Sequence, residues 1–296
     1  MTTPRFGRLI TAMVTPFTAD GSLDLPRAGA LAERLISQGS DALLVCGTTG
    51  ESPTVFYDQK LDLFRSVLEA NQGRVPVIAN VGDNCTDDSI HFARKVEGLG
   101  VDALMAVVPY YNKPPQEGLY RHFRAIAQAV ELPVILYNIP ARCVINMEPS
   151  TIVRLAADCP NIVAVKQANS DLSQAAEIIA SAPAGFEVLA GDDELTLPMM
   201  AIGGTGVISV LSNIAGPQFK EMIEAQVAGD HTRALRLHLE LLPLIKTLFI
   251  TANPIMVKKA FELMGYPVGG VRLPLIEANQ AQEAELSAVL RHLDLI

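Results

Sequence analysis

The sequence has little that would suit it to a nucleic acid or to a membrane. Its 23 basic residues are outnumbered by 32 acidic residues, so its formal net charge at pH 7 is −9. This imbalance argues against nucleic acid and against an anionic membrane surface as partners. No run of 18 apolar residues occurs, and residues 1–17 contain no apolar stretch long enough for the core of a signal peptide. We therefore predict a soluble, globular protein.

The sequence has only four cysteines, and their spacing matches no common disulfide or metal-binding pattern. Cys46, Cys85, Cys143 and Cys159 form no CxxC pair and no spacing typical of extracellular disulfide frameworks. Cys46 ends an apolar run, where a cysteine is usually a small core residue. A chain of 296 residues can bury a large core without the help of disulfides or a structural metal. These features predict a reducing, cytoplasmic compartment.

The motifs of common cofactor sites are also missing. There is no GxxxxGK[ST] motif, and no GxGxxG sequence lies between a strand and a helix. The glycines of the stretch 202–209 precede an expected strand, which favours close backbone packing over phosphate binding. All five histidines lie in segments with helical periodicity rather than at strand ends. Because catalytic transition-metal sites usually use imidazoles, the strand ends lack the usual ligands of such a site. We predict neither a cofactor nor a metal. The histidines are His91, His122, His231, His238 and His292.

What the sequence does contain is a regular alternation of strands and helices. Eight short apolar runs begin between 20 and 34 residues apart, about the length of one βα unit. Because the runs are apolar throughout, they favour a parallel sheet that is buried on both faces. Helix-period segments between them begin near Asp58, Asp87 and Pro149. This pattern predicts a (β/α)8 barrel, with a doubly wound sheet as the alternative. The runs begin at Ile10, Ala42, Pro76, Ala103, Pro133, Ile162, Phe186 and Gly206.

The chain beyond the eighth run has helical periodicity throughout. One of its helices would complete the barrel, so we expect a catalytic barrel over residues 1–230. The remaining residues, 231–296, are predicted to form a helical C-terminal region. No flexible linker separates the two parts, which indicates that this region packs on the barrel.

The strand ends contain the residues with chemical potential, because active sites of such barrels lie at the carboxyl ends of their strands. Lys166 shares a strand face with Ile162 and Ala164. On an inward face its ammonium group would be desolvated, which favours the neutral amine that attacks a carbonyl to form a Schiff base. Tyr137 ends the preceding strand at the same height and could relay protons. The alternatives are a lysine whose head reaches solvent and a tyrosine that packs at the rim.

The turn after the second apolar run is the other candidate. Thr48 and Thr49 offer hydroxyl groups, and Gly47 and Gly50 leave backbone N–H groups accessible. Such a turn can bind a carboxylate, although an ordinary connection between strand and helix has a similar sequence. Taken together, the strand ends indicate lysine-based carbon–carbon chemistry without a metal.

Seven motifs along the chain occur in an order that resembles one known family. This is the family of pyruvate-dependent lyases and synthases that includes dihydrodipicolinate synthase and N-acetylneuraminate lyase. The likeness extends from about residue 6 to the C-terminus. The motifs are GTTGES (47–52), PYYNKP (109–114), YNIPAR (137–142), AVKQA (164–168), AGDD (190–193), GGTGVISV (203–210) and ANPIMVK (252–258).

The resemblance implies a barrel fold and assigns roles in proton transfer. Lys166 matches the lysine that forms the imine with pyruvate, and Tyr137 matches the tyrosine that donates and accepts protons. Thr48 and Tyr111 would complete a proton relay. In the family that second tyrosine reaches in from a neighbouring subunit, which implies a homotetramer built from two dimers.

Four further positions match residues that bind substrate in the family. Thr49 and the backbone of Ile208 would hold pyruvate, and the backbone of Gly191 would line the same pocket. Arg142 would bind the carboxylate of a second substrate, since a guanidinium grips a carboxylate through two parallel hydrogen bonds.

Within the family, the sequence is most similar to members that condense pyruvate with L-aspartate 4-semialdehyde. That reaction yields 4-hydroxy-tetrahydrodipicolinate for diaminopimelate and lysine biosynthesis. This assignment within the family rests on Arg142 and on the PYYNKP motif. One alternative is an aldolase that acts on a keto-sugar acid of the 2-keto-3-deoxygluconate or N-acetylneuraminate type. A barrel that only binds or regulates is the other alternative.

The sequence departs from the family pattern at two positions near the site. Gln167 stands where glutamate is usual, and Cys143 stands where threonine is usual. These departures bear on the expected rate and fine specificity and leave the expected reaction class unchanged. The resemblance also places a pocket for the inhibitor L-lysine, in which Lys60 would repel the ammonium group of the effector. We therefore predict weak or absent inhibition. The matching positions are Pro53, Tyr57, Lys60, Asn84, Asp88 and Tyr110.

Overall fold

In a computed structural model that describes residues 4–296, eight strands form one closed barrel in chain order. The predicted (β/α)8 fold is therefore confirmed, and residues 1–3 of the expected barrel lie outside the described residues. The strands paired in the structure run parallel, as their apolar sequences predict. Their bounds are β1 Leu9–Ala12, β2 Ala42–Val45, β3 Val77–Asn80, β4 Ala103–Val107, β5 Val134–Asn138, β6 Ile162–Gln167, β7 Glu187–Ala190 and β8 Gly206–Ser209.

Three of the helices begin where the sequence predicts. The expected starts at Asp58, Asp87 and Pro149 lie within one residue of the observed starts of α2, α3 and α6. No helix within residues 4–296 is both long enough and apolar enough to cross a membrane. The helices are α1 Leu25–Ser37, α2 Tyr57–Asn71, α3 Thr86–Glu97, α4 Gln116–Gln128, α5 Pro140–Cys143, α6 Pro149–Asp158, α7 Leu172–Ser181, α8 Thr196–Ala201, α9 Ser212–Val227, α10 His231–Leu248, α11 Ile255–Leu263 and α12 Gln280–His292, with short 3₁₀ turns η1 Ser52–Thr54 and η2 Asp193–Leu195.

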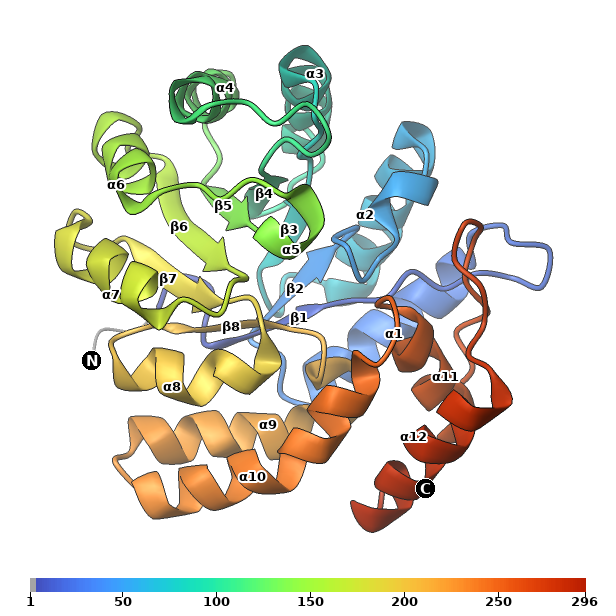
Figure 1. Ribbon diagram of the computed structural model, residues 1–296. Coiled ribbons are helices and arrows are strands. Elements are labelled where there is room, and N and C mark those ends of the chain that lie inside the picture. The colour runs from blue at the N-terminus through green and yellow to red at the C-terminus, as the bar shows by residue number, and fades with distance from the viewer. Residues whose placement is uncertain (1–3) are drawn as a thin grey trace. The chain divides into compact units, whose positions relative to one another are not determined.

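One compact unit of the chain comprises residues 9–75 and 209–296. It contains β1, β2 and the four C-terminal helices, of which α9 and α10 pack along each other (Figure 1). Asp230 caps the N-terminus of α10 by accepting a hydrogen bond from the backbone N–H of Arg233. Large apolar side chains such as Leu31 and Phe219 are fully buried in this unit.

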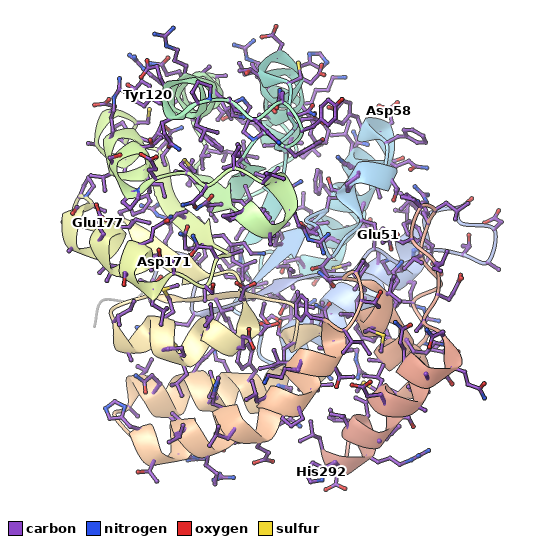
Figure 2. The ribbon with its side chains drawn as sticks, viewed as in Figure 1. Glu51, Asp58, Tyr120, Asp171, Glu177 and His292 are labelled. Carbon is purple, nitrogen blue, oxygen red and sulfur yellow. The ribbon has the colours of Figure 1, made fainter. Side chains whose placement is uncertain are left out.

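The other compact unit comprises residues 76–208 together with residues 4–8. It contains β3 to β7, whose residues are nearly all buried, and the helices α3 to α8. Figure 2 shows Tyr120 on α4 and Asp171 at the start of α7. Tyr120 donates a hydrogen bond to Asp158 at 2.7 Å, and Asp171 accepts one from the backbone N–H of Gln174. The domain boundary expected at residue 230 stays a prediction.

Candidate active site

Lys166 and Tyr137 lie side by side in the barrel wall. Strands β5 and β6 are neighbours, and their register pairs Tyr137 directly with Lys166. The Lys166 Nζ atom lies 4.4 Å from the centroid of the Tyr137 ring, which is within the range of a cation–π contact. Each side chain is only 4% exposed. The pairing predicted from the strand ends is therefore present, and the lysine head does not reach bulk solvent.

The surroundings of Lys166 favour its neutral amine. Burial lowers the pKa of Lys166 to about 8, and the charge of Arg142 lowers it further, whereas the carboxylates of Asp192 and Asp193 raise it. Burial is the largest of these effects. At this pKa about a tenth of the amine is neutral at pH 7, compared with about one part in 3,000 at the ordinary value. A lysine with this pKa can act as a nucleophile toward a carbonyl at neutral pH.

Two carboxylates missed as site residues by the sequence reasoning act on Lys166. Asp192 and Asp193 follow β7, which is paired with β6. Burial raises the pKa of the Asp192 carboxyl, and the ammonium of Lys166 lowers it. Their position directly after a strand was the available signal, but nothing in the sequence showed that their charges act on Lys166.

Gly191 lies where no side chain fits. An added Cβ atom would stand 2.5 Å from the Cβ of Ala168 and 2.9 Å from its Cα. The Gly191 N–H donates a hydrogen bond to the Gln167 carbonyl at 2.8 Å, which continues the pairing of β6 with β7. Glycine is therefore needed here because the two backbones approach closely.

Arg142 is carried by α5, a single helical turn that begins two residues after β5 ends. Its side chain is exposed. Val144 terminates the turn with a φ of 68°, in the left-handed region that β-branched residues rarely adopt. The Val144 N–H donates a hydrogen bond to the Pro140 carbonyl at 2.9 Å and holds this conformation. The turn therefore presents a cation whose charge acts on Lys166.

A network of carboxamides surrounds the other face of β6. The Asn138 amide donates to Gln167 Oε1 at 3.1 Å and to Asn146 Oδ1 at 2.7 Å. Asn138 Oδ1 accepts a hydrogen bond from the Met147 N–H. The buried Gln167 Nε2 group has no partner among residues 4–296. Gln167 thus keeps this layer uncharged, where a glutamate would place an anion one residue from Lys166.

Thr48 and Thr49 belong to the other compact unit, in the turn that follows β2. Thr48 is half-buried and Thr49 is buried. The Thr49 hydroxyl accepts a hydrogen bond from the Asn253 amide at 3.0 Å, a contact between residues 204 positions apart. The turn has left-handed residues at both ends, Cys46 with a φ of 58° and Glu51 with a φ of 54°. Glu51 and Asn253 lie in the motifs GTTGES and ANPIMVK, but the sequence reasoning assigned neither of them a role.

The remaining predicted residues differ in exposure. Tyr111 follows β4, has a φ of 72° and is 90% exposed. Ile208 is fully buried in β8. Within residues 4–296, no group of three or more His, Cys, Asp or Glu side chains is arranged to hold a metal ion.

Comparison with known proteins places these residues in a described family. The sequence model of the dihydrodipicolinate synthetase family matches residues 5–293. A 4-hydroxy-tetrahydrodipicolinate synthase from Symbiobacterium thermophilum is 54% identical over 97% of this chain and 98% of that protein. Another from Moorella thermoacetica is 53% identical over 99% of this chain and all of that protein. The crystal structure of a dihydrodipicolinate synthase from Cyanidioschyzon merolae with lysine bound has a TM-score of 0.98, 45% identity and coverage of 99% of this chain and 100% of that one.

Proposed function

Because this chain belongs to the dihydrodipicolinate synthetase family, we propose that it is a lyase that condenses pyruvate with L-aspartate 4-semialdehyde to give 4-hydroxy-tetrahydrodipicolinate. The observation that carries this proposal is the buried Lys166, whose pKa is lowered to about 8, beside Tyr137. Relatives that are 53% and 54% identical over nearly the whole chain bear the name of this synthase. No comparable observation favours the keto-sugar acid alternative.

The first half of the reaction uses the neutral Nζ of Lys166. It attacks the ketone carbon of pyruvate, and loss of one water molecule leaves an imine. Removal of a proton from the methyl group then gives an enamine. We assign these proton transfers to Tyr137, assisted by Thr48 and Tyr111. Thr49 and the backbone of Ile208 and Gly191 would hold pyruvate.

The second half forms the carbon–carbon bond. The enamine carbon attacks the aldehyde carbon of the semialdehyde, whose carboxylate Arg142 would hold through two hydrogen bonds. The amino group of this substrate then attacks the imine carbon, closes the ring and releases the Lys166 amine. Each of these residues lies at or after the carboxyl end of its strand, where the active sites of (β/α)8 barrels are found, which supports these assignments.

Two further proposals concern assembly and compartment. Tyr111 is 90% exposed, which supports a role in which it reaches into a neighbouring subunit of a homotetramer built from two dimers. The four cysteines are free thiols, which supports the proposed reducing cytoplasm.

The proposed reaction is tested by comparing substrates. The purified protein is given pyruvate with L-aspartate 4-semialdehyde, and separately N-acetylneuraminate and 2-keto-3-deoxygluconate. We expect the condensation to have a kcat/KM far above that of pyruvate release from either sugar acid. If pyruvate release is the faster reaction, the aldolase alternative is correct.

Arg142→Lys is expected to weaken binding of the second substrate selectively. Lysine keeps the positive charge but cannot form two parallel hydrogen bonds, so the KM for the semialdehyde should rise about tenfold or more. Steady-state kinetics with each substrate varied would measure this effect. The control is Arg121→Lys, which changes an exposed arginine paired with Glu117 on α4 and should alter neither KM. An unchanged KM for the semialdehyde in the Arg142 variant would exclude Arg142 as the residue that binds this substrate.

L-Lysine is expected to inhibit this enzyme weakly or not at all. Lys60 is buried, and its Nζ atom lies 5.3 Å from the centroid of the Tyr57 ring, so a positive charge stands at a position that matches the family's effector pocket. The test is the initial rate over a series of L-lysine concentrations. Lys60→Gln, which removes this charge, should increase the sensitivity. Half-maximal inhibition of the wild type by sub-millimolar lysine would contradict the prediction.

A further inference from the structure

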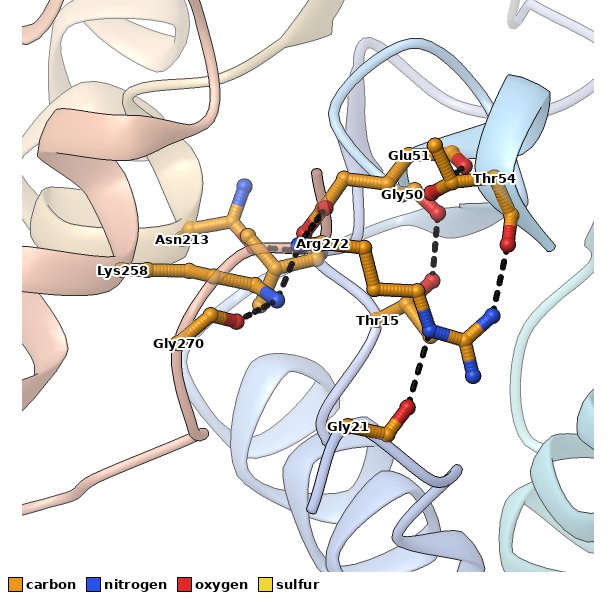
Figure 3. A network of polar contacts seen from close by, with 10 residues as sticks. Thr15, Gly21, Gly50, Glu51, Thr54, Asn213, Lys258, Gly270 and Arg272 are labelled. Carbon is orange, nitrogen blue, oxygen red and sulfur yellow. Dashed lines mark hydrogen bonds and ion pairs between the residues drawn. The ribbon is translucent and has the colours of Figure 1, made fainter. Parts of the chain in front are cut away.

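A buried network of charges lies beside the turn that carries Thr48 and Thr49 (Figure 3). The Lys258 Nζ atom on α11 lies 2.6 Å from Glu51 Oε1, and the two side chains are 3% and 1% exposed. The backbone N–H of Arg272 donates a hydrogen bond to Glu51 Oε2 at 2.9 Å. Both oxygens of the Glu51 carboxylate are therefore held by residues more than 200 positions later in the chain.

The same network holds the segment around the turn. The Arg272 guanidinium donates to the Thr54 carbonyl at 2.6 Å, to the Gly21 carbonyl at 2.9 Å and to Gln59 Oε1 at 2.9 Å. Lys258 donates a further hydrogen bond to the Gly270 carbonyl at 2.6 Å. Thr54 lies three residues after Glu51, so Arg272 restrains the chain directly after the turn.

The turn needs such restraint because its backbone is strained. Glu51 ends it in the left-handed region, which is disfavoured for a residue with a side chain. Gly50 is tightly enclosed: an added Cβ atom would lie 3.0 Å from Cys46 Cα and 3.1 Å from Thr15 Oγ1. The Thr15 hydroxyl donates to the Gly50 carbonyl at 2.6 Å. The conformation of the turn is therefore set by tertiary contacts rather than by local preference.

Stability alone is a weak reason to bury these charges. Replacing a buried ion pair by apolar residues is often neutral or stabilising, because the pair must be desolvated. The desolvation is visible here, since burial lowers the pKa of Lys258 to about 8, although the Glu51 carboxylate opposes this shift. The contacts do fix the orientation of the Glu51 side chain, because each carboxylate oxygen has a partner at a fixed position.

We propose that Glu51, Lys258 and Arg272 are positioning residues that fix the turn carrying Thr48 and Thr49, so that the C-terminal region of the chain determines how tightly pyruvate binds. This inference rests on the proposed function, because it takes Thr49 as a residue that binds pyruvate. None of the three residues is assigned a contact with substrate. They act through the backbone of the turn.

The test uses Glu51→Gln, which preserves the shape of the side chain and removes its charge. Wild type and variant are incubated with a series of pyruvate concentrations and reduced with borohydride, and the adduct on Lys166 is measured by mass. We expect the half-saturating pyruvate concentration to rise about tenfold or more, because small misplacements of binding groups are costly. The yield at saturation should stay close to that of the wild type, since Lys166 itself is unchanged.

A double variant separates positioning from stability. Glu51→Gln combined with Lys258→Met removes both members of the ion pair, so the thermal midpoint should recover relative to Glu51→Gln alone. Pyruvate capture should stay weak, because the anchor of the turn is still missing. If capture recovers together with the thermal midpoint, the network is only structural and the inference is wrong.

The matched control is Lys220→Met. Lys220 forms a half-buried ion pair with Asp41, directly before β2, whereas the turn follows this strand. This variant should lower the thermal midpoint and leave pyruvate capture unchanged. A wild type that gives no adduct would overturn the proposed function and with it this inference. A wild-type adduct whose concentration dependence is the same in Glu51→Gln would overturn this inference alone.

Discussion

Replacing Lys166 with methionine is expected to abolish the reaction and to make the folded protein more stable. Methionine cannot form an imine, so kcat/KM should fall about 10⁴-fold or more, in the range seen when an enzyme loses its nucleophile. Borohydride reduction in the presence of pyruvate should label the wild type at Lys166 and leave the variant unlabelled. Equal labelling of the two proteins would exclude the proposed mechanism.

The gain in stability follows from the pKa of Lys166. Its shift from 10.5 to about 8 corresponds to a cost of about 3 kcal/mol for the protonated lysine in the folded state. Between pH 8 and pH 10.5 the unfolded chain binds more protons than the folded chain, so the wild type gains stability as the pH rises. Below pH 8 the cost is present in full. Methionine removes it, but leaves Asp192 and Asp193 without this cation.

We therefore expect the Lys166→Met variant to exceed the wild type by about 1–3 kcal/mol in free energy of unfolding at pH 7. The difference should shrink as the pH approaches 10.5. Urea unfolding of both proteins at pH 7 and at pH 10 would measure it. A variant that is less stable than the wild type at pH 7 would show that the protonated Lys166 does not lower the free energy of unfolding.

Tyr137→Phe is expected to have the second-largest effect. The change removes one hydroxyl and keeps the aromatic ring 4.4 Å from Lys166 Nζ, so the burial and the pKa of the lysine should change little. Without the hydroxyl of the proposed proton carrier, kcat should fall about 10²- to 10⁴-fold. The Lys166 adduct should still form, but more slowly, which rapid-quench borohydride trapping would show.

The matched control is Tyr120→Phe, which makes the same change at another buried tyrosine. The Tyr120 hydroxyl donates to Asp158 at 2.7 Å on the helices α4 and α6. Its loss should lower the free energy of unfolding by about 1 kcal/mol and leave kcat unchanged. A Tyr137→Phe variant that keeps more than half of the wild-type kcat would exclude Tyr137 as the proton carrier.

Much of the fold and part of the site could be predicted from local patterns. The number of apolar runs, eight, and their spacing, which is that of βα units, predict the closed barrel that is observed. The pairing of Tyr137 with Lys166 follows from the order of the strands, because neighbouring parallel strands end at similar heights. The glycines and hydroxyls of the turn at Thr48 and Thr49 made it a candidate in the sequence, and its role in binding stays a prediction.

The network around that turn had no such local signal. Lys258 and Arg272 lie more than 200 residues from Glu51 in the chain. Glu51 and Lys258 belong to two of the matched motifs, but nothing in the sequence indicates that their side chains pair. The effect of Asp192 and Asp193 on Lys166 was hidden for the same reason. Charges that are distant in sequence interact only when the fold brings them together and excludes water.

The sequence by itself determined the order of strands and helices, the chemical groups at the strand ends and the family to which they belong. Periodicity and residue type carry that information, and both are local properties. Only the tertiary structure decided that Lys166 is buried enough to be partly neutral at pH 7, and that Glu51 is held by Lys258 and Arg272. Desolvation and Coulomb energy depend on the three-dimensional distances to neighbouring groups, and those distances exist only in the folded chain.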